Sequence, residues 1–445
     1  MQGIVKLEDV QRGLALLRHT GSTCKVVYLL RSLPLDAFNG VFHDFLVAFD
    51  RLQYDHLGQV LRLGSLGQAE VLQVGLAPTK AGFGMRSSLR HANSAFVAGC
   101  AGAAPMIGKL FGGEGAFVDP RLEPAVERYN RDLGREEGAA GLLQVAELLE
   151  GTPPHQEALS APLDVADTAR YLELRPGREH AARIAALCEP HTSTFLLATP
   201  DPDRNLLLSN QEMTAYCSFR LGRVPHEGAP CPVCRTGVLD VHGYHQVSGC
   251  VKGSHRHRRH REVTEENGRH ATRAGFQVYH DVSITLSNSL QRPSDLSIRG
   301  FLNGKDASID VTVTNPLAES HLTTAAVGAP VRAVERAEQA KVRKYRDLFA
   351  NQANVEFMPM AASVYGGWGP SAEKVLERIL AAPMDYDGAR VWTMTSQHSA
   401  GSSKWTTPHF PLALSRHFRI SDPSPQVSSH EARSGCPPVG LWCSR

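Results

Sequence analysis

The chain has 445 residues, of which 42% are hydrophobic and 21% are charged. This length predicts roughly two to four domains, and this apolar content excludes wholesale disorder. The 47 lysines and arginines nearly balance the 45 aspartates and glutamates, which excludes a uniformly basic nucleic-acid coat, so that any nucleic-acid surface must be local.

The start of the chain is polar where a secretory signal has its apolar stretch, with Lys6, Glu8 and Asp9 in that place. The longest apolar run stops short of the ~18 residues that a membrane span requires. We therefore expect an intracellular protein with no membrane partner, nuclear if it is functional. Nine scattered cysteines indicate reduced thiols and one metal site rather than a disulfide framework.

Residues 1–113 show a helical pattern, and we expect them to form a helical region with Asp36 able to cap a helix after Pro34. One apolar stripe recurs at steps of three and four residues and is expected to face the core; it comprises Phe38, Val41, Phe42, Phe45, Leu46, Phe49 and Leu52.

Residues 114–228 are more charged and less regular, which predicts a helical connector. Near its end, Ser209 and Glu212 form the signature of a capping box, and Gly222 is expected to end that helix. At the other end of the chain, residues 383–445 are rich in Ser, Pro, His and Gly, which predicts a mostly disordered tail.

The region 229–251 contains a cluster of cysteine and histidine residues within the text CPVCRTGVLDVHGYHQVSGC. The C-x2-C spacing allows a tight turn to aim two thiolates at one tetrahedral zinc ion. His245 is favoured over His242 as the third ligand because H-x4-C is the spacing of small zinc knuckles. We expect a structural zinc site of Cys231, Cys234, His245 and Cys250, with a coincidental cluster as the alternative.

A basic stretch follows the cluster, with the text VKGSHRHRRHREVTEENGRHATR. Such runs are usually solvated helix faces, but a neighbouring zinc knuckle favours contacts with a phosphate backbone. Nucleic acid is therefore the expected partner, contacted by Arg256, Arg258, Arg259, His260 and Arg292.

Two alternating runs are joined at Asn303-Gly304 in the text RPSDLSIRGFLNGKDASIDVTVTNP, which predicts a β-hairpin. Asp295 starts the first strand, and Asp310 lies on the second strand, on the face opposite the core. Paired carboxylates at a sheet edge can hold Mg²⁺, which activates water and neutralises charge during phosphodiester cleavage.

The next predicted helix, from about Val331 to Ala350, carries Lys341 and Lys344 on its polar side. A lysine near the metal can orient the attacking water or balance negative charge on the phosphate in the transition state.

These features occur in an order that resembles the C-terminal region of early-branching non-LTR retrotransposon proteins, which carry a restriction-like endonuclease. The matching residues are Cys231, Cys234, His245 and Cys250, Arg259-His260, Arg292-Pro293-Ser294-Asp295, Asp310-Val311-Thr312-Val313, Lys344-Tyr345 and Tyr365-Gly366-Gly367-Trp368-Gly369. The stretches LAPTKAGFGMRSS and LLLSNQEMTAYCSFRLG resemble the helical region that follows the polymerase in such proteins.

The resemblance implies a PD-(D/E)XK-type nuclease domain over residues 252–382, with Asp295 and Asp310 as Mg²⁺ ligands and Lys344 as the catalytic lysine. Thr312 stands where the motif ordinarily has lysine, and Ser294 stands where it has proline. DNA and the RNA of the element are the partners that the resemblance implies.

The expected fold class is thus α+β and multidomain, with a helical N-terminal half, a zinc knuckle and an α/β nuclease domain. No Y-x-D-D polymerase motif occurs in the chain, so we do not expect reverse transcription. The expected activity is DNA nicking. The alternatives are an inactive remnant that still binds zinc and nucleic acid, and a decayed reading frame whose product scarcely folds.

Overall fold

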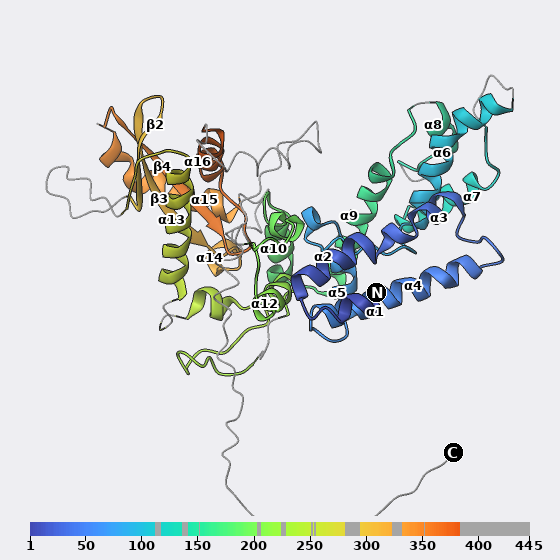
Figure 1. The fold of residues 1–445 in the computed structure, drawn as a ribbon, viewed down its shortest axis with the longest axis horizontal. Coiled ribbons are helices and arrows are strands. Elements are labelled where there is room, and N and C mark those ends of the chain that lie inside the picture. The colour runs from blue at the N-terminus through green and yellow to red at the C-terminus, as the bar shows by residue number, and fades with distance from the viewer. Residues whose placement is uncertain are drawn as a thin grey trace, which may run out of the picture.

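The chain forms an α+β fold, as the sequence predicts, with a helical N-terminal half and a small sheet in its C-terminal part (Figure 1). The expected tail, 383–445, and Arg292 lie outside the residues that the structure describes. This computed structural model describes residues 1–111, 117–135, 141–150, 152–202, 206–223, 228–250, 252, 255–280, 294–322, 332–350 and 352–382.

The helices before residue 228 are short to medium in length. They are α1 (Gln2–Val5), α2 (Val10–Thr20), η1 (Thr23–Lys25), α3 (Val27–Ser32), α4 (Val41–Val60), α5 (Gln68–Gly75), η2 (Pro78–Lys80), α6 (Ala92–Leu110), α7 (Leu122–Asp132), α8 (Val145–Glu150), α9 (Gln156–Leu174), α10 (Arg178–Leu187), α11 (Thr194–Leu197) and α12 (Asn210–Leu221).

Among the described residues, strands begin only at Val278. The later elements are η3 (His245–Gly249), α13 (His255–Arg273), β1 (Val278–His280), β2 (Leu296–Leu302), β3 (Lys305–Thr314), α14 (Glu319–Leu322), α15 (Ala333–Phe349), β4 (Val355–Ser363) and α16 (Pro370–Ala381).

The elements lie in three groups along the long axis of the molecule. Helices α3, α6, α7 and α8 lie at one end, the sheet with α13, α15 and α16 lies at the other, and α10 and α12 lie between them (Figure 1). No helix among the described residues combines the length and the apolar character that crossing a bilayer requires.

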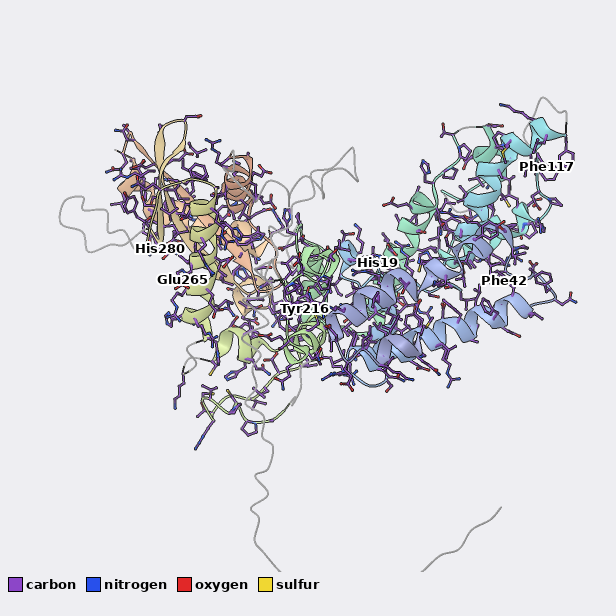
Figure 2. All side chains as sticks on the ribbon, in the orientation of Figure 1. His19, Phe42, Phe117, Tyr216, Glu265 and His280 are labelled. Carbon is purple, nitrogen blue, oxygen red and sulfur yellow. The ribbon has the colours of Figure 1, made fainter. Side chains whose placement is uncertain are left out.

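The apolar stripe of α4 is only partly buried, which corrects the expectation that all of it faces the core. Phe42 and Leu46 are buried against α3 and α6, and Phe42 lies near the start of the helix (Figure 2). Val41, Phe45 and Leu52 form a second row, about 100° around the helix, that is exposed. The sequence contains two neighbouring apolar rows, and only one of them meets other helices.

The start of α4 also differs from the expectation. Gly40, with φ of +90°, precedes the first residue of the helix, so Asp36 does not cap it. The carboxylate of Asp36 instead accepts a hydrogen bond of 3.1 Å from Arg128 of α7.

Helix α12 has the boundaries that its sequence predicts. The backbone amide of Ser209 donates to Glu212 Oε2 at 2.9 Å, and the amide of Glu212 donates to Ser209 Oγ, which completes the capping box. Gly222 has φ of +66° and ends the helix in the left-handed conformation.

Buried arginines join residues 76–88 to residues 206–222. The guanidinium of Arg220, on α12, is 1% exposed and donates to the carbonyl oxygens of Pro78 and Gly82. Arg183 of α10, which is fully buried, donates to the carbonyl of Arg220 and to Gln73 Oε1. Residues far apart in the sequence therefore meet at the centre of the molecule.

The sheet has the strand order β1-β2-β3-β4. β1 and β2 pair antiparallel, β2 and β3 form the expected antiparallel hairpin, and β3 and β4 pair parallel. Asn303 and Gly304 have φ of +49° and +82° at the hairpin turn, the conformation that favours Asn-Gly there. The hairpin prediction is confirmed.

Both faces of the sheet are covered. On one face, Ile309 and Val311 belong to a core that includes Val263 of α13. On the other face, Phe357 of β4 packs its ring against the rings of Tyr345 and Phe349 of α15.

The face of β3 that carries Asp310 is the one covered by α15. Asp310 is only 6% exposed, which corrects the expectation that it projects away from the packed interior. The alternating pattern of β3 is that of a strand with one solvated face, but the polar face of this strand is buried under a helix.

Candidate functional site

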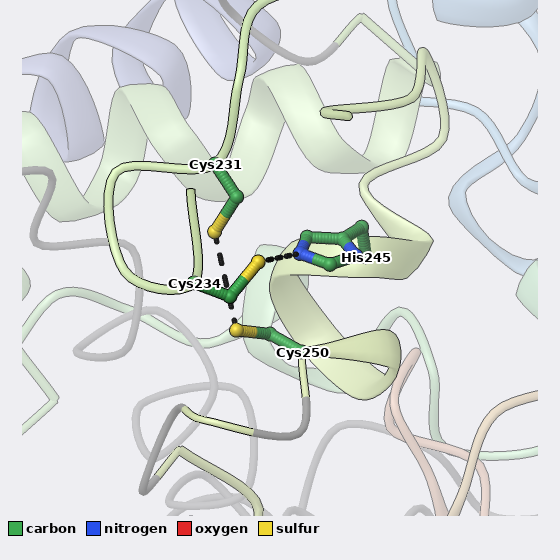
Figure 3. Close-up of side chains that lie close together, drawn as sticks. All are labelled: Cys231, Cys234, His245 and Cys250. Atoms are coloured by element: carbon green, nitrogen blue, oxygen red, sulfur yellow. Dashed lines mark hydrogen bonds between the residues drawn. The ribbon is translucent and has the colours of Figure 1, made fainter. Parts of the chain in front are cut away.

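The four expected zinc ligands lie together (Figure 3). Their ligand atoms are all within 4.8 Å of one another. The Sγ atoms of Cys231 and Cys250 are 3.9 Å apart, and Cys234 Sγ lies 3.3 Å from His245 Nε2. Tetrahedral zinc places its ligand atoms about 3.4–3.8 Å apart, so the four residues fit a zinc ion. Within the described residues this is the only group of three or more metal-ligating side chains.

A short hairpin positions the first two ligands. Pro230 and Val238 form an isolated antiparallel bridge, and the amide of Cys231 donates to the carbonyl of Gly237 at 2.7 Å. A Cβ atom at residue 237 would lie 2.1 Å from His245 Cε1. Only glycine leaves room for the imidazole at this position.

Asp240, which was not among the residues expected at the site, positions the third ligand. Its Oδ2 accepts from the amide of His245 at 2.7 Å, and its Oδ1 accepts from the amides of His242 and Tyr244. The sequence does contain a signal for this role: Asp240 precedes a tight turn, and Asp side chains commonly accept hydrogen bonds from the backbone amides that follow them.

The electrostatics of the cluster favour a bound cation. The amide of Gly237 donates to Cys234 Sγ at 3.2 Å. This hydrogen bond, with further ones from Thr236 and His245, lowers the pKa of the Cys234 thiol to about 5, and the thiolate is the form that binds metal. His242 lies outside the cluster, with its ring packed edge-on against His180 of α10.

A second polar site lies where β2 begins beside β3. The amide of Asp295 donates to the carbonyl of Ile309, and Asp295 Oδ2 accepts from the amide of Val311 at 2.7 Å. The Asp295 carboxylate is thereby fixed next to Asp310. Burial raises the pKa of Asp310, Lys341 lowers it, and the negative charge of Asp295 raises it further.

The lysine that contacts this pair is Lys341. Its Nζ lies 2.7 Å from Asp310 Oδ2, in an ion pair whose side chains are 26% and 8% exposed. Lys344, the expected catalytic lysine, lies one turn later, is exposed and donates to the Tyr345 hydroxyl at 2.9 Å. This bond raises the pKa of Lys344, with a smaller contribution from Asp310.

His260 of α13 completes this site. Its Nε2 lies 3.2 Å from Asp295 Oδ2 and 3.0 Å from the carbonyl oxygen of Val311. The hydrogen bond to Asp295 raises the pKa of His260. His260 was expected on a nucleic-acid-binding face, but its ring contacts the Asp295 carboxylate. We refer to Asp295, Asp310, Lys341 and His260 as the acidic site.

The other residues expected to bind nucleic acid have different surroundings. Arg256 and Arg258 are exposed on α13, and Arg258 pairs with Glu262 at 2.9 Å. Arg259 is 3% exposed and donates to the carbonyl of Val247 at 2.8 Å. An exposed contact with phosphate is therefore open to Arg256 and Arg258, whereas the guanidinium of Arg259 is directed into the protein.

The chain matches no protein-family model and no curated protein.

Proposed function

We propose that this chain is a metal-dependent DNA endonuclease module of a retrotransposon-derived protein, stabilised by zinc. The observation that carries the proposal is a pair of contacts beside one strand: Lys341 of α15 pairs with Asp310 of β3, and His260 of α13 contacts Asp295, whose carboxylate accepts from the amide of the next residue of β3, Val311.

Asp295 and Asp310 would hold Mg²⁺ through carboxylate oxygens. Two carboxylates suffice, because Mg²⁺ usually keeps several waters and takes further ligands from phosphates of the substrate. Bound there, the ion would lower the pKa of an attacking water and neutralise charge on the scissile phosphate.

The remaining residues have roles that follow from their positions. His260 holds the Asp295 carboxylate from the side of α13. Lys341 balances the charge of Asp310, and Lys344, exposed one turn later, is available to a phosphate oxygen of DNA. The exposed arginines Arg256 and Arg258 would contact the DNA backbone, and the RNA of the element is a second polyanion for the same surface.

A plasmid assay tests this proposal. Purified full-length chain should nick supercoiled plasmid in the presence of Mg²⁺, and Asp310→Asn should lower the nicking rate at least 100-fold. Asp306→Asn is the matched control, because Asp306 lies on the same strand but pairs with the exposed Arg299; it should stay within about twofold of wild type. Equal rates for the two variants would contradict the proposal.

The second candidate function is that of a remnant that binds zinc and nucleic acid without cleaving. The 2.7 Å ion pair that occupies Asp310, together with Thr312 in place of the usual lysine, favours it. In that case wild-type protein binds DNA in a gel-shift assay but leaves the plasmid supercoiled.

A further inference from the structure

The turn between two zinc-ligand positions packs into the domain that carries the acidic site. Val247, in η3, is 7% exposed and belongs to the same core as Val263 of α13 and Ile309 of β3. The carbonyl oxygen of Val247 accepts from Arg259 Nη1 at 2.8 Å, and Ser248 Oγ accepts from Asn315 Nδ2 at 3.0 Å. The metal cluster is therefore attached to the sheet domain by its own turn.

The two donors in these contacts lie next to the acidic site in the sequence. Arg259 immediately precedes His260, which contacts Asp295. Asn315 immediately follows β3, the strand that carries Asp310. A shift of Arg259 would move α13, which carries His260. A shift of Asn315 would move the end of β3, which carries Asp310.

Arg259 depends on the turn more strongly than an exposed arginine would. It is 3% exposed, and the ion pairs of the described residues do not include it. Burying a guanidinium is costly unless acceptors replace its water. The carbonyl of Val247 supplies an acceptor for Nη1, whereas Nε is buried without one. The guanidinium therefore depends on the Val247 carbonyl, and the position of the turn is energetically linked to the position of α13.

The cluster in turn determines the shape of the turn. His245 and Cys250 bound η3, and the amide of Cys250 donates to the carbonyl of His245 at 2.9 Å. A metal ion held by both side chains would close the five-residue turn and would thereby fix the direction of the Val247 carbonyl between them.

We propose that Arg259 is a positioning residue that couples the Cys/His metal centre to the acidic site: it holds α13 against the metal-bound turn and thereby keeps His260 on Asp295. Asn315 makes the corresponding link from Ser248 to the end of β3. The expected effect on cation binding at Asp295 and Asp310 rests on the proposed nuclease function. The link between the metal-bound turn and the position of α13 does not depend on it.

The test compares Arg259→Met with Arg256→Met in the full-length, zinc-loaded chain. Arg256 is exposed one turn earlier on the same helix, so both variants lose one positive charge from α13. Three quantities are measured: zinc per chain, hydrogen–deuterium exchange of peptides covering residues 294–298 and 309–313, and the dissociation constant for Mn²⁺.

For Arg259→Met we expect wild-type zinc content, exchange at least tenfold faster in the two peptides and Mn²⁺ binding at least fivefold weaker. The amide of Val311, which donates to Asp295, should show the largest change. Arg256→Met should match wild type in all three measurements. Exchange within twofold of wild type in Arg259→Met would overturn the coupling.

A second variant covers the case in which Arg259→Met does not fold. Ser248→Ala removes only the oxygen that accepts from Asn315 and should accelerate exchange of the 309–313 peptide at least threefold; unchanged exchange would overturn the coupling. If the wild type neither binds Mn²⁺ nor nicks DNA, the nuclease proposal fails, but the exchange data still decide whether the coupling exists.

Discussion

The ammonium group of Lys341 lies 2.7 Å from Oδ2 of Asp310, and the lysine comes from a helix while the acid lies in the middle of a buried strand. The helix α15 thus brings a positive charge onto the polar face of β3. Without that charge, Asp310 would be a buried carboxylate that has lost its ion-pair partner.

Lys341→Met should lower the midpoint of urea unfolding at pH 7, corresponding to a loss of about 1–3 kcal/mol for a buried carboxylate deprived of its partner. Lys344→Met, its exposed neighbour on the same helix, should change stability by less than about 0.5 kcal/mol. Both variants should nick plasmid at least tenfold more slowly. A Lys341→Met protein as stable as Lys344→Met would show that the ion pair contributes nothing.

The choice between two histidines at the metal centre can be checked by metal analysis. His245→Ala should lower bound zinc well below one ion per chain, because Nε2 of His245 lies within the ligand cluster. His242→Ala should keep one zinc per chain, since its ring packs against His180 instead. Zinc is measured by atomic absorption after dialysis; loss of zinc from both variants would contradict this assignment.

Glu338 of α15 is a buried carboxylate whose oxygens accept from backbone amides at the start of α16. Oε2 accepts from Ser371 and Oε1 accepts from Ala372, both at 3.0 Å. Glu338→Ala should therefore lower the free energy of unfolding by about 2–4 kcal/mol, because the buried amide of Ala372 and the partly buried amide of Ser371 lose their acceptor. Gln339→Ala, at the next and exposed position, is the control and should have little effect on the urea midpoint.

His91 should make stability sensitive to acid. Burial, with the nearby charges of Arg86 and Arg90, lowers its pKa from 6.5 to about 3. The folded protein therefore holds His91 neutral, and its contribution is fully present above pH 6.5 and is lost as the pH falls from 6.5 toward 3.

A His91→Gln variant measures this contribution, because glutamine does not titrate. Between pH 7.5 and pH 5.5 the free energy of unfolding of wild type should fall by about 1.4 kcal/mol more than that of the variant. At pH 5.5, one unit below the ordinary histidine pKa, His91 is protonated in the unfolded chain but not in the folded one, which favours unfolding. The readout is the urea midpoint at each pH. The exposed His43→Gln is the control, and a wild-type profile parallel to that of His91→Gln would contradict the assignment.

The sequence predicted the features that depend on residues close together in the chain: a helix cap, a hairpin turn and a pair of neighbouring cysteines. The capping box of Ser209 and Glu212 defines α12, and Asn303-Gly304 defines the turn between β2 and β3. The C-x2-C spacing predicted that Cys231 and Cys234 would lie beside each other. In each case the residues that decide the structure lie within a few positions in the sequence.

Features that depend on packing between distant segments could not be predicted in the same way. Helical periodicity places both Lys341 and Lys344 on one polar side, but only the packing of α15 on β3 decides which of them reaches Asp310. Likewise, a run of arginines does not show that Arg259 points inward, because the partner of its guanidinium lies on a turn twelve residues earlier.

Gln11 connects the first helices to a segment far along the chain. Its Nε2 donates to the carbonyl of Leu206, 195 residues later, and its Oε1 accepts from the amide of Leu208. A ribosome adds about 5–20 residues per second, so Gln11 is synthesised about 10–40 s before Leu206. During that interval the nascent chain carries the first helices without their final neighbour, so both hydrogen bonds of Gln11 form only after residues 206–208 have been made.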